Sequence, residues 1–157
     1  MRDEFPNQAV KVAQQVFETM FFATVEVDEA GEEKRDPDGR PSFSWIGAEI
    51  GFEGRLSGQM AFFVPAELAR TMVANFLGLE EEAPTPSQAL DVVGELCNMV
   101  CGNLFSKLDR KGVWVLTPPK AWECSEPTLP RDKGDAGISL PLLVEGYPVK
   151  LEIRFAP

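Results

Sequence analysis

Two stretches in which apolar and polar residues roughly alternate, residues 45–64 and 136–155, constrain the fold of this chain most strongly. Alternation with a period of two is typical of strands that bury one face. Each stretch is interrupted by a Glu-Gly pair, at Glu53-Gly54 and at Glu145-Gly146. A glycine between two alternating runs indicates a turn, so each stretch is predicted to form a β-hairpin.

Helical patterns precede both hairpins. Apolar residues recur at helical spacing over residues 6–23, which predicts a first helix there. They recur again from the segment at Thr85 to about Leu108, which predicts a second helix. The second helix has a clear start, because the sequence Thr85-Pro86-Ser87-Gln88 matches a capping box with threonine at the N-cap and proline at the first helical position. A third helix is predicted over residues 65–77, and we expect its apolar residues to face inward: Leu68, Met72, Phe76 and Leu77.

The remaining segments are short or polar. Short strands are predicted at Val25–Val27 and Trp114–Leu116. Residues 28–42 carry nine charges and two prolines, a composition that favours an exposed loop. Residues 117–134 are also predicted to form a polar loop.

The two halves of the chain therefore repeat the same plan of helix, short strand, polar loop and hairpin. This repeat predicts a duplicated unit in which residues 65–77 form a bridging helix. The expected fold class is α+β, with an antiparallel sheet covered by long helices, in a single domain over residues 1–157. Two unrelated hairpins are the alternative.

Composition excludes several functions. The chain has no histidine, which removes histidine-based catalysis and histidine-ligated zinc. Its three cysteines lack metal-binding spacing, and Cys97 and Cys101 are expected to be core residues. A net charge of −10 disfavours nucleic acid and anionic membranes as partners. The polar N-terminus and the absence of long apolar runs predict a soluble, cytoplasmic protein with no membrane contact.

The helix that ends near Leu108 carries an unusual polar stripe. An α-helix turns about 100° per residue, so the polar residues of this stripe fall within a sector of roughly 80°: Asp91, Glu95, Asn98, Gly102 and Ser106. No cation interrupts this stripe, although solvated helix faces usually mix charges. The alternative is an ordinary solvated face, which every amphipathic helix has.

Three further residues favour a docking surface over that alternative. Gly102 costs about 1 kcal/mol in a helix interior relative to alanine, which suits a position that another molecule must approach closely. Met99 and Phe105 flank the stripe and are expected to form apolar shoulders around it.

The sequence ELCNMVCGN at residues 95–103, preceded by Asp91, resembles the signature of the CheC/CheX/FliY phosphatases of bacterial chemotaxis. It is most similar to the CheX branch, and the resemblance in length and in repeated plan extends over nearly the whole chain. The family implies hydrolysis of the aspartyl phosphate on a CheY-like receiver domain. It also implies that Asn98 orients the attacking water and that Glu95 pairs with the lysine of the receiver's active site.

The resemblance carries further expectations. Mg2+ would be held by the receiver, so no cofactor or metal is expected on this chain, and CheX-type relatives imply a homodimer. Asp91 is expected to contribute to docking. On the first helix Gln14, Glu18 and Phe21 occupy the positions equivalent to the Asp-Glu-Asn pattern, and phenylalanine cannot orient a water, so a single active site is predicted.

Two other functions remain open. The chain could be a non-catalytic CheX-like module that docks a receiver or a flagellar or signalling partner. It could also be an unrelated hydrolase that uses paired carboxylates, although its sequence supplies no sugar-binding aromatic cluster.

Overall fold

The structure is a computed structural model that describes residues 2–27, 44–78, 83–129 and 137–156. The predicted loop at residues 28–42 lies outside the described residues. Among the residues described, none of the helices has the length and apolar character needed to cross a membrane.

The helices form where the sequence predicts them. A short 3-10 turn, η1, over Arg2–Glu4 leads into the first helix. The α-helices are α1 (Phe5–Phe21), α2 (Ala66–Leu77) and α3 (Pro86–Leu108). α2 begins one residue later than expected, because Pro65 ends the preceding strand and serves as the N-cap.

A seven-stranded sheet gathers strands from both halves of the chain. Its strands are β1 (Val25–Val27), β2 (Trp45–Glu53), β3 (Gly58–Pro65), β4 (Val115–Leu116), β5 (Lys120–Cys124), β6 (Ile138–Val144) and β7 (Tyr147–Phe155). The order is β1-β6-β7-β3-β2-β4, with β5 also paired to β2, and every pairing is antiparallel. Exchanging β1 with β4, β2 with β6 and β3 with β7 gives the same order read from the opposite edge of the sheet, so the repeat seen in the sequence is also present in the sheet.

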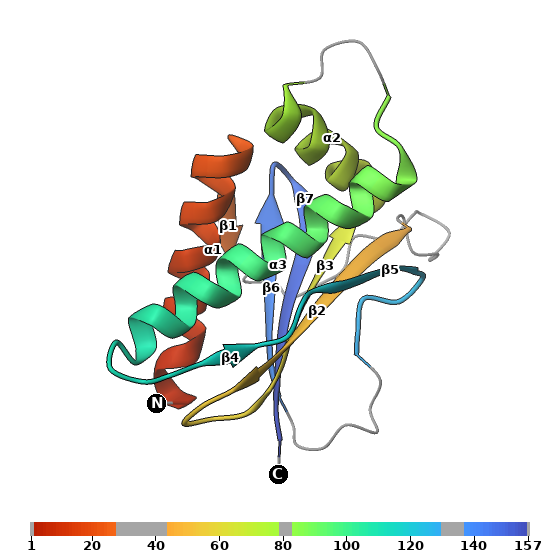
Figure 1. The fold of residues 1–157 in the computed structure, drawn as a ribbon. Coiled ribbons are helices and arrows are strands. Elements are labelled where there is room, and N and C mark those ends of the chain that lie inside the picture. Colours follow the sequence, from red (N-terminus) through yellow and green to blue (C-terminus); the bar gives the residue numbers. More distant parts are fainter. Residues whose placement is uncertain (1, 28–43, 79–82, 130–136, 157) are drawn as a thin grey trace.

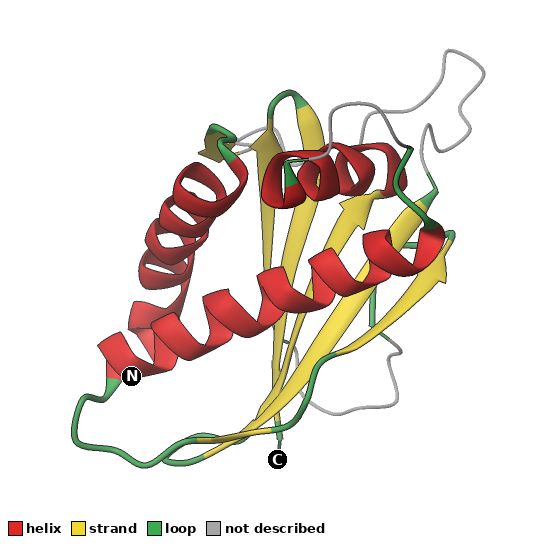
Figure 2. Ribbon diagram, turned by 45° about the horizontal axis from the view of Figure 1, so that its top comes forward, coloured by secondary structure: helices red, strands yellow, loops and turns green. Residues whose placement is uncertain are grey.

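All three helices lie on one face of the sheet (Figures 1 and 2). α3 crosses this face diagonally and packs against α1 and α2 as well as against β2. The main core fills the layer between helices and sheet, because alternate residues of each long strand point toward the helices. Cys97 and Cys101 belong to this core, as predicted.

The two predicted hairpins form, but their turns differ. The second has a two-residue turn in which Glu145 (φ 50°) and Gly146 (φ 80°) both adopt the left-handed conformation, the geometry of a type I′ turn. In the first hairpin the strands end at Glu53 and Gly58, so the turn is longer than a Glu-Gly pair. Gly54 does not have a positive φ. A Cβ at this position would come within 2.5 Å of the Trp114 ring.

The prediction of a loop throughout residues 117–134 is wrong in part, because Lys120–Cys124 form strand β5. β5 pairs with β2 from Trp45 to Glu49. Its short, mixed sequence has no clear alternation. It forms a strand because it pairs with the edge of β2. Residues 130–136 of that segment lie outside the described residues.

A second, smaller cluster covers part of the opposite face of the sheet. Its buried members are Trp45, Ala61, Phe63 and Leu129. Next to it lies Glu152, the only charged residue among the buried ones in the described ranges, at 4% exposure. Its carboxylate pairs with Arg154 at 2.7 Å and with Lys150 at 3.5 Å.

This ion cluster also holds a neighbouring segment on the sheet. The hydroxyl of Thr128 donates to Glu152 at 3.4 Å, and the guanidinium of Arg154 donates to the carbonyl of Leu129 at 3.3 Å. Glu152 and its ion-pair partner Arg154 therefore hold the Thr128–Leu129 segment against the back of the sheet.

Candidate functional site

α3 is the element that presents the candidate site. Its N-terminus is fixed by the predicted capping box: Thr85 Oγ1 accepts a hydrogen bond from the Gln88 backbone at 3.1 Å, and Gln88 Oε1 accepts one from the Thr85 backbone at 2.9 Å. At the other end the Asp109 backbone donates to the Phe105 carbonyl at 3.1 Å. Between these caps the helix spans 23 residues, about 34 Å, and it is anchored along its length by buried side chains.

The polar stripe faces solvent. Asp91, Glu95 and Asn98 are exposed, while Val92, Val93, Leu96 and Cys97 on the other sides of the same turns are buried. Glu95 and Asn98 stand one turn apart and point the same way, as helix geometry requires. Neither side chain forms a hydrogen bond or ion pair with any residue in the described ranges, so both are available to a partner.

The site supports limited chemistry on its own. It offers one carboxylate and one amide. The thiols on the buried side of α3 do not add a nucleophile, because burial raises the pKa of Cys101 to about 12 and holds that of Cys97 well above its usual value. Within the described residues no group of three or more His, Cys, Asp or Glu side chains could hold a metal ion. Such a site can position and orient groups brought by a partner.

The docking residues predicted around the stripe differ in exposure. Met99 is half-buried at the side of the stripe, and Gly102 has open space where a Cβ would stand, with no atom within 4 Å other than the neighbouring atoms of α3 itself. The prediction that Phe105 forms an exposed shoulder is wrong, since this side chain is only 1% exposed. Its ring packs against Trp114 at 4.4 Å and Phe52 at 4.5 Å between ring centres, because the segment after α3 folds back over the end of the helix.

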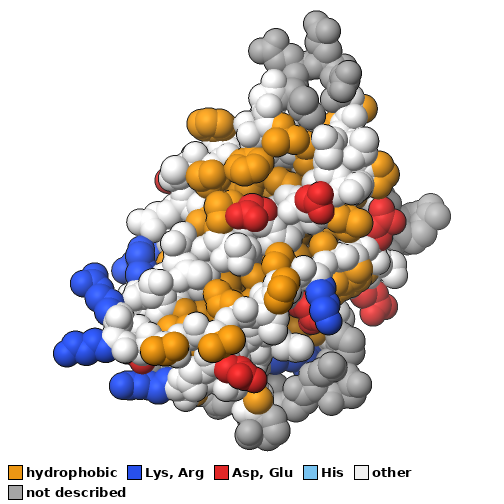
Figure 3. Space-filling model, in the orientation of Figure 1, with side chains coloured by type: hydrophobic (Ala, Val, Ile, Leu, Met, Phe, Trp, Pro, Cys, Tyr) orange, Lys and Arg blue, Asp and Glu red, His pale blue; other side chains and the backbone are white. Residues whose placement is uncertain are grey.

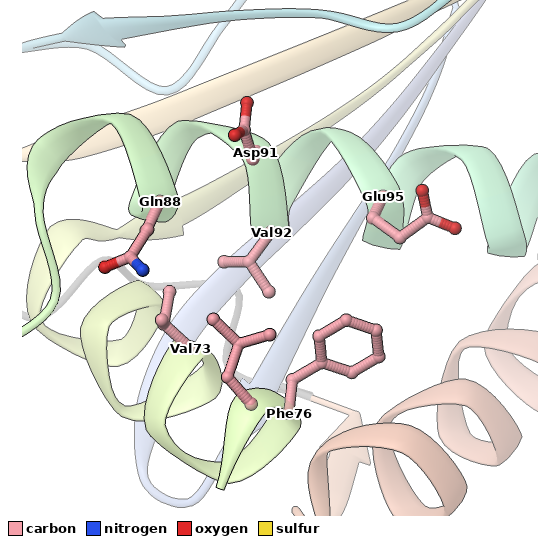
Figure 4. Close-up of a pocket in the computed structure, with 7 residues that line it drawn as sticks. Val73, Phe76, Gln88, Asp91, Val92 and Glu95 are labelled. Atoms are coloured by element: carbon pink, nitrogen blue, oxygen red, sulfur yellow. The ribbon is translucent and has the colours of Figure 1, made fainter. Parts of the chain in front are cut away.

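A groove lies between the end of α2 and the start of α3, which we call the α2–α3 groove. It has a volume of about 380 Å3. Its lining residues are Val73, Phe76, Leu77, Gln88, Asp91, Val92 and Glu95. Figure 4 shows Val92 pointing from α3 toward Val73 and Phe76 on α2, with Asp91 and Glu95 carried by α3. The groove therefore places apolar side chains next to two carboxylates of the polar stripe, those of Asp91 and Glu95.

Phe76 and Leu77 correct the sequence-based prediction for α2. They were expected to face inward, yet Phe76 is 40% and Leu77 52% exposed. The groove separates this end of α2 from α3, so neither helix covers them. The signal in the sequence was a pair of large apolar residues directly before the capping residue Gly78, but helical periodicity alone assigned them to the core.

Residues 46–143 match the family model described as chemotaxis phosphatase CheX. This range includes the whole of α3 and its polar stripe. The chain belongs to the CheX family. Membership of the CheX family agrees with the resemblance read from residues 95–103, and the matched range covers more than half of the chain.

Among proteins of established identity, the chain is 35% identical over 71 residues to the CheY-P phosphatase CheX of Thermotoga maritima. That match covers 45% of this chain and 46% of the relative, so it spans less than half of the relative's length.

Solved structures share the CheX-like fold. The chemotaxis protein CheX from Vibrio vulnificus has a TM-score of 0.77 at 22% identity, covering 99% of this chain and 98% of that one. A CheX-CheY-BeF3-Mg+2 complex from Borrelia burgdorferi has a TM-score of 0.61 at 14% identity, covering 96% of this chain and 97% of that one. At these identities the likeness establishes the α+β fold.

The helix related to α3 by the repeat, α1, does not carry an equivalent site. Phe21, at the position corresponding to Asn98, is fully buried and packs against Phe76 with 5.6 Å between ring centres. Glu18 is exposed, and the Gln14 amide donates to the Val25 carbonyl at 3.5 Å. In this CheX-family chain, the exposed acid and amide of the motif therefore occur together on α3.

Proposed function

We propose that this chain hydrolyses the aspartyl phosphate of a CheY-like receiver domain, with Glu95 and Asn98 reaching into the receiver's active site. The observation that carries the proposal is the exposed pair of Glu95 and Asn98 on one ridge of α3, neither of which has a hydrogen-bond or ion-pair partner in the described part of the chain. Membership of the CheX family supports it, as does the match to a relative named CheY-P phosphatase.

The residue types suit this reaction. An acyl phosphate is already reactive, and phosphoryl transfer passes through a loose transition state with the attacking and leaving oxygens in line. The phosphatase then needs mainly to position a water opposite the leaving carboxylate. The Asn98 amide can both accept from and donate to that water, which requires neither histidine nor a metal on this chain.

Glu95 serves a different purpose in the proposal. Its carboxylate pairs with the lysine of the receiver's active site and fixes the approach of the two proteins. Asp91 and Met99 lie on the same side of α3 and contribute to docking. We also propose that the receiver supplies Mg2+ and that this chain forms a homodimer.

The test is phosphate release from a panel of receivers phosphorylated with a radiolabel, with and without the protein. We expect wild-type protein to accelerate release from at least one receiver. Glu95→Lys is expected to weaken docking by at least about 100-fold, because it sets a lysine against a lysine and such like-charge contacts cost several kcal/mol. Glu18→Lys makes the same charge change on the exposed face of α1 and is expected to leave the rate unchanged.

Two outcomes would contradict the proposal. If no receiver loses phosphate faster in the presence of the protein but one binds it tightly, the chain is a docking module without turnover. If Glu95→Lys and Glu18→Lys behave alike on a responsive receiver, the assignment of Glu95 is wrong.

Replacement of Gly102 by alanine is expected to separate stability from activity. The added methyl group meets no atom beyond the neighbouring atoms of α3, so the protein should gain about 1 kcal/mol in the free energy of unfolding. The same methyl group stands on the stripe next to Asn98 and should hinder a closely packed receiver, raising KM by about tenfold. Urea denaturation and the phosphate-release assay measure the two effects. A variant that is both more stable and fully active would show that Gly102 is not needed for close approach.

A further inference from the structure

Large apolar side chains are exposed at the end of the molecule where α1 and α2 finish. Phe22 is 74% exposed, and it joins the exposed Phe76 and Leu77 in a surface that we call the α1–α2 tip. The Phe21 ring contacts the Phe76 ring, and the Asn75 amide donates to the Phe21 carbonyl at 3.0 Å, which brings the ends of the two helices together. In Figure 3 hydrophobic side chains gather on this part of the surface, with acidic side chains beside them on α3.

Phe22 occupies a backbone conformation that phenylalanine disfavours. Its φ of 54° lies in the left-handed region, where it caps α1 by donating its backbone N–H to the Phe17 carbonyl. Glycine or asparagine is the usual residue at such a position. The side chain gains little from burial in return, because most of it is in solvent. A strained, exposed aromatic residue lowers the free energy of unfolding without a compensating gain from burial. Backbone strain of this kind is concentrated at functional sites.

The tip continues into the α2–α3 groove, whose rim is acidic. Asp91 and Glu95 line it, and no lysine or arginine is among the described residues that line it. The hollow of about 380 Å3 falls within the size range of clefts that bind ligands through apolar contacts. An occupant that fits both features carries a large apolar side chain next to a basic one.

We propose that the α2–α3 groove and the α1–α2 tip bind an apolar side chain of the receiver domain that lies beside the basic residue facing Glu95. This inference rests on the proposed function, since Glu95 lines both the groove and the proposed site. The tip then supplies affinity, while Asn98 supplies the chemistry. A second copy of this chain is a poorer occupant, because a symmetric contact would set its acidic rim against an identical acidic rim.

The double substitution Phe22→Asn with Leu77→Gln tests this directly. Asparagine accepts the left-handed conformation and glutamine is a good helix former, so the variant should unfold at the same temperature as the wild type or higher. KM for the phosphorylated receiver should rise by at least about tenfold, with the loss falling on KM and little on kcat. Val113→Gln is the matched control, because Val113 is 82% exposed and follows the other end of α3.

The outcomes are distinguishable. A rise in KM for the double variant and none for the control supports the docking surface. Equal KM for wild type, double variant and control overturns it while leaving the phosphatase assignment intact. Wild-type protein that fails to accelerate phosphate loss from any receiver overturns the proposed function and this inference with it. Sedimentation that shows a wild-type dimer dissociated by the double substitution, with KM unchanged, identifies the tip as a contact between copies and also overturns the inference.

Discussion

Replacing Asn98 with alanine is expected to lower kcat for phosphate loss from the receiver by about 100-fold while leaving the affinity for the receiver within a few fold. The reason is that the proposed role of the amide is to orient a water. Loss of the orienting group removes the near-attack geometry, and misplacement by about 1 Å can cost about 100-fold in rate. The fold should tolerate the change, because Asn98 is exposed and makes no hydrogen bond within the described residues.

The matched control is Asn103→Ala. Asn103 is also an exposed asparagine of α3, but it lies about 140° around the helix from Asn98. Single-turnover kinetics with saturating protein would separate chemistry from binding. If Asn98→Ala hydrolysed the phosphorylated receiver at the wild-type rate, the water-orienting role would be lost. If the two asparagine variants were equally slow, the effect would come from the helix and not from the stripe.

Replacing Glu152 with alanine is expected to lower the free energy of unfolding by about 3–5 kcal/mol. The carboxylate is buried, and its removal leaves both Arg154 and Lys150 without their shared partner. Removing one member of a buried ion cluster is costly because the charge that remains is desolvated and unpaired. The segment carrying Thr128 and Leu129 also loses one of its links to the sheet.

Urea denaturation measures this effect. Glu123→Ala is the matched control, because Glu123 is an exposed carboxylate on strand β5, and its loss should change stability by no more than about 0.5 kcal/mol. A Glu152→Ala variant that unfolded within about 1 kcal/mol of the wild type would show that the cluster does not hold the back of the sheet. The candidate site lies on the helical face of the sheet, so we expect any phosphate-release activity to survive at low temperature.

The features of the fold that could be predicted from the sequence depend on interactions between residues close together in the chain. The capping box at Thr85 fixed the start of α3 because its hydrogen bonds join residues three apart. The hairpins followed from alternation, and the repeat of helix and hairpin was reproduced by the strand order of the sheet. β5 was missed because its pairing with β2 joins residues far apart, and nothing in Lys120–Cys124 by itself distinguishes a strand from a loop.

The same distinction between local and long-range interactions applies to the candidate site. That Asp91, Glu95 and Asn98 share one exposed side of a helix was determined by the sequence alone, because the angle between residues of an α-helix is a local property of the backbone. The burial of Phe105 beneath Trp114, the exposure of Phe76 and Leu77, and the groove that links them to Glu95 were decided only by the tertiary structure. Each of these depends on which distant segment covers a side chain, and helical periodicity carries no information about that.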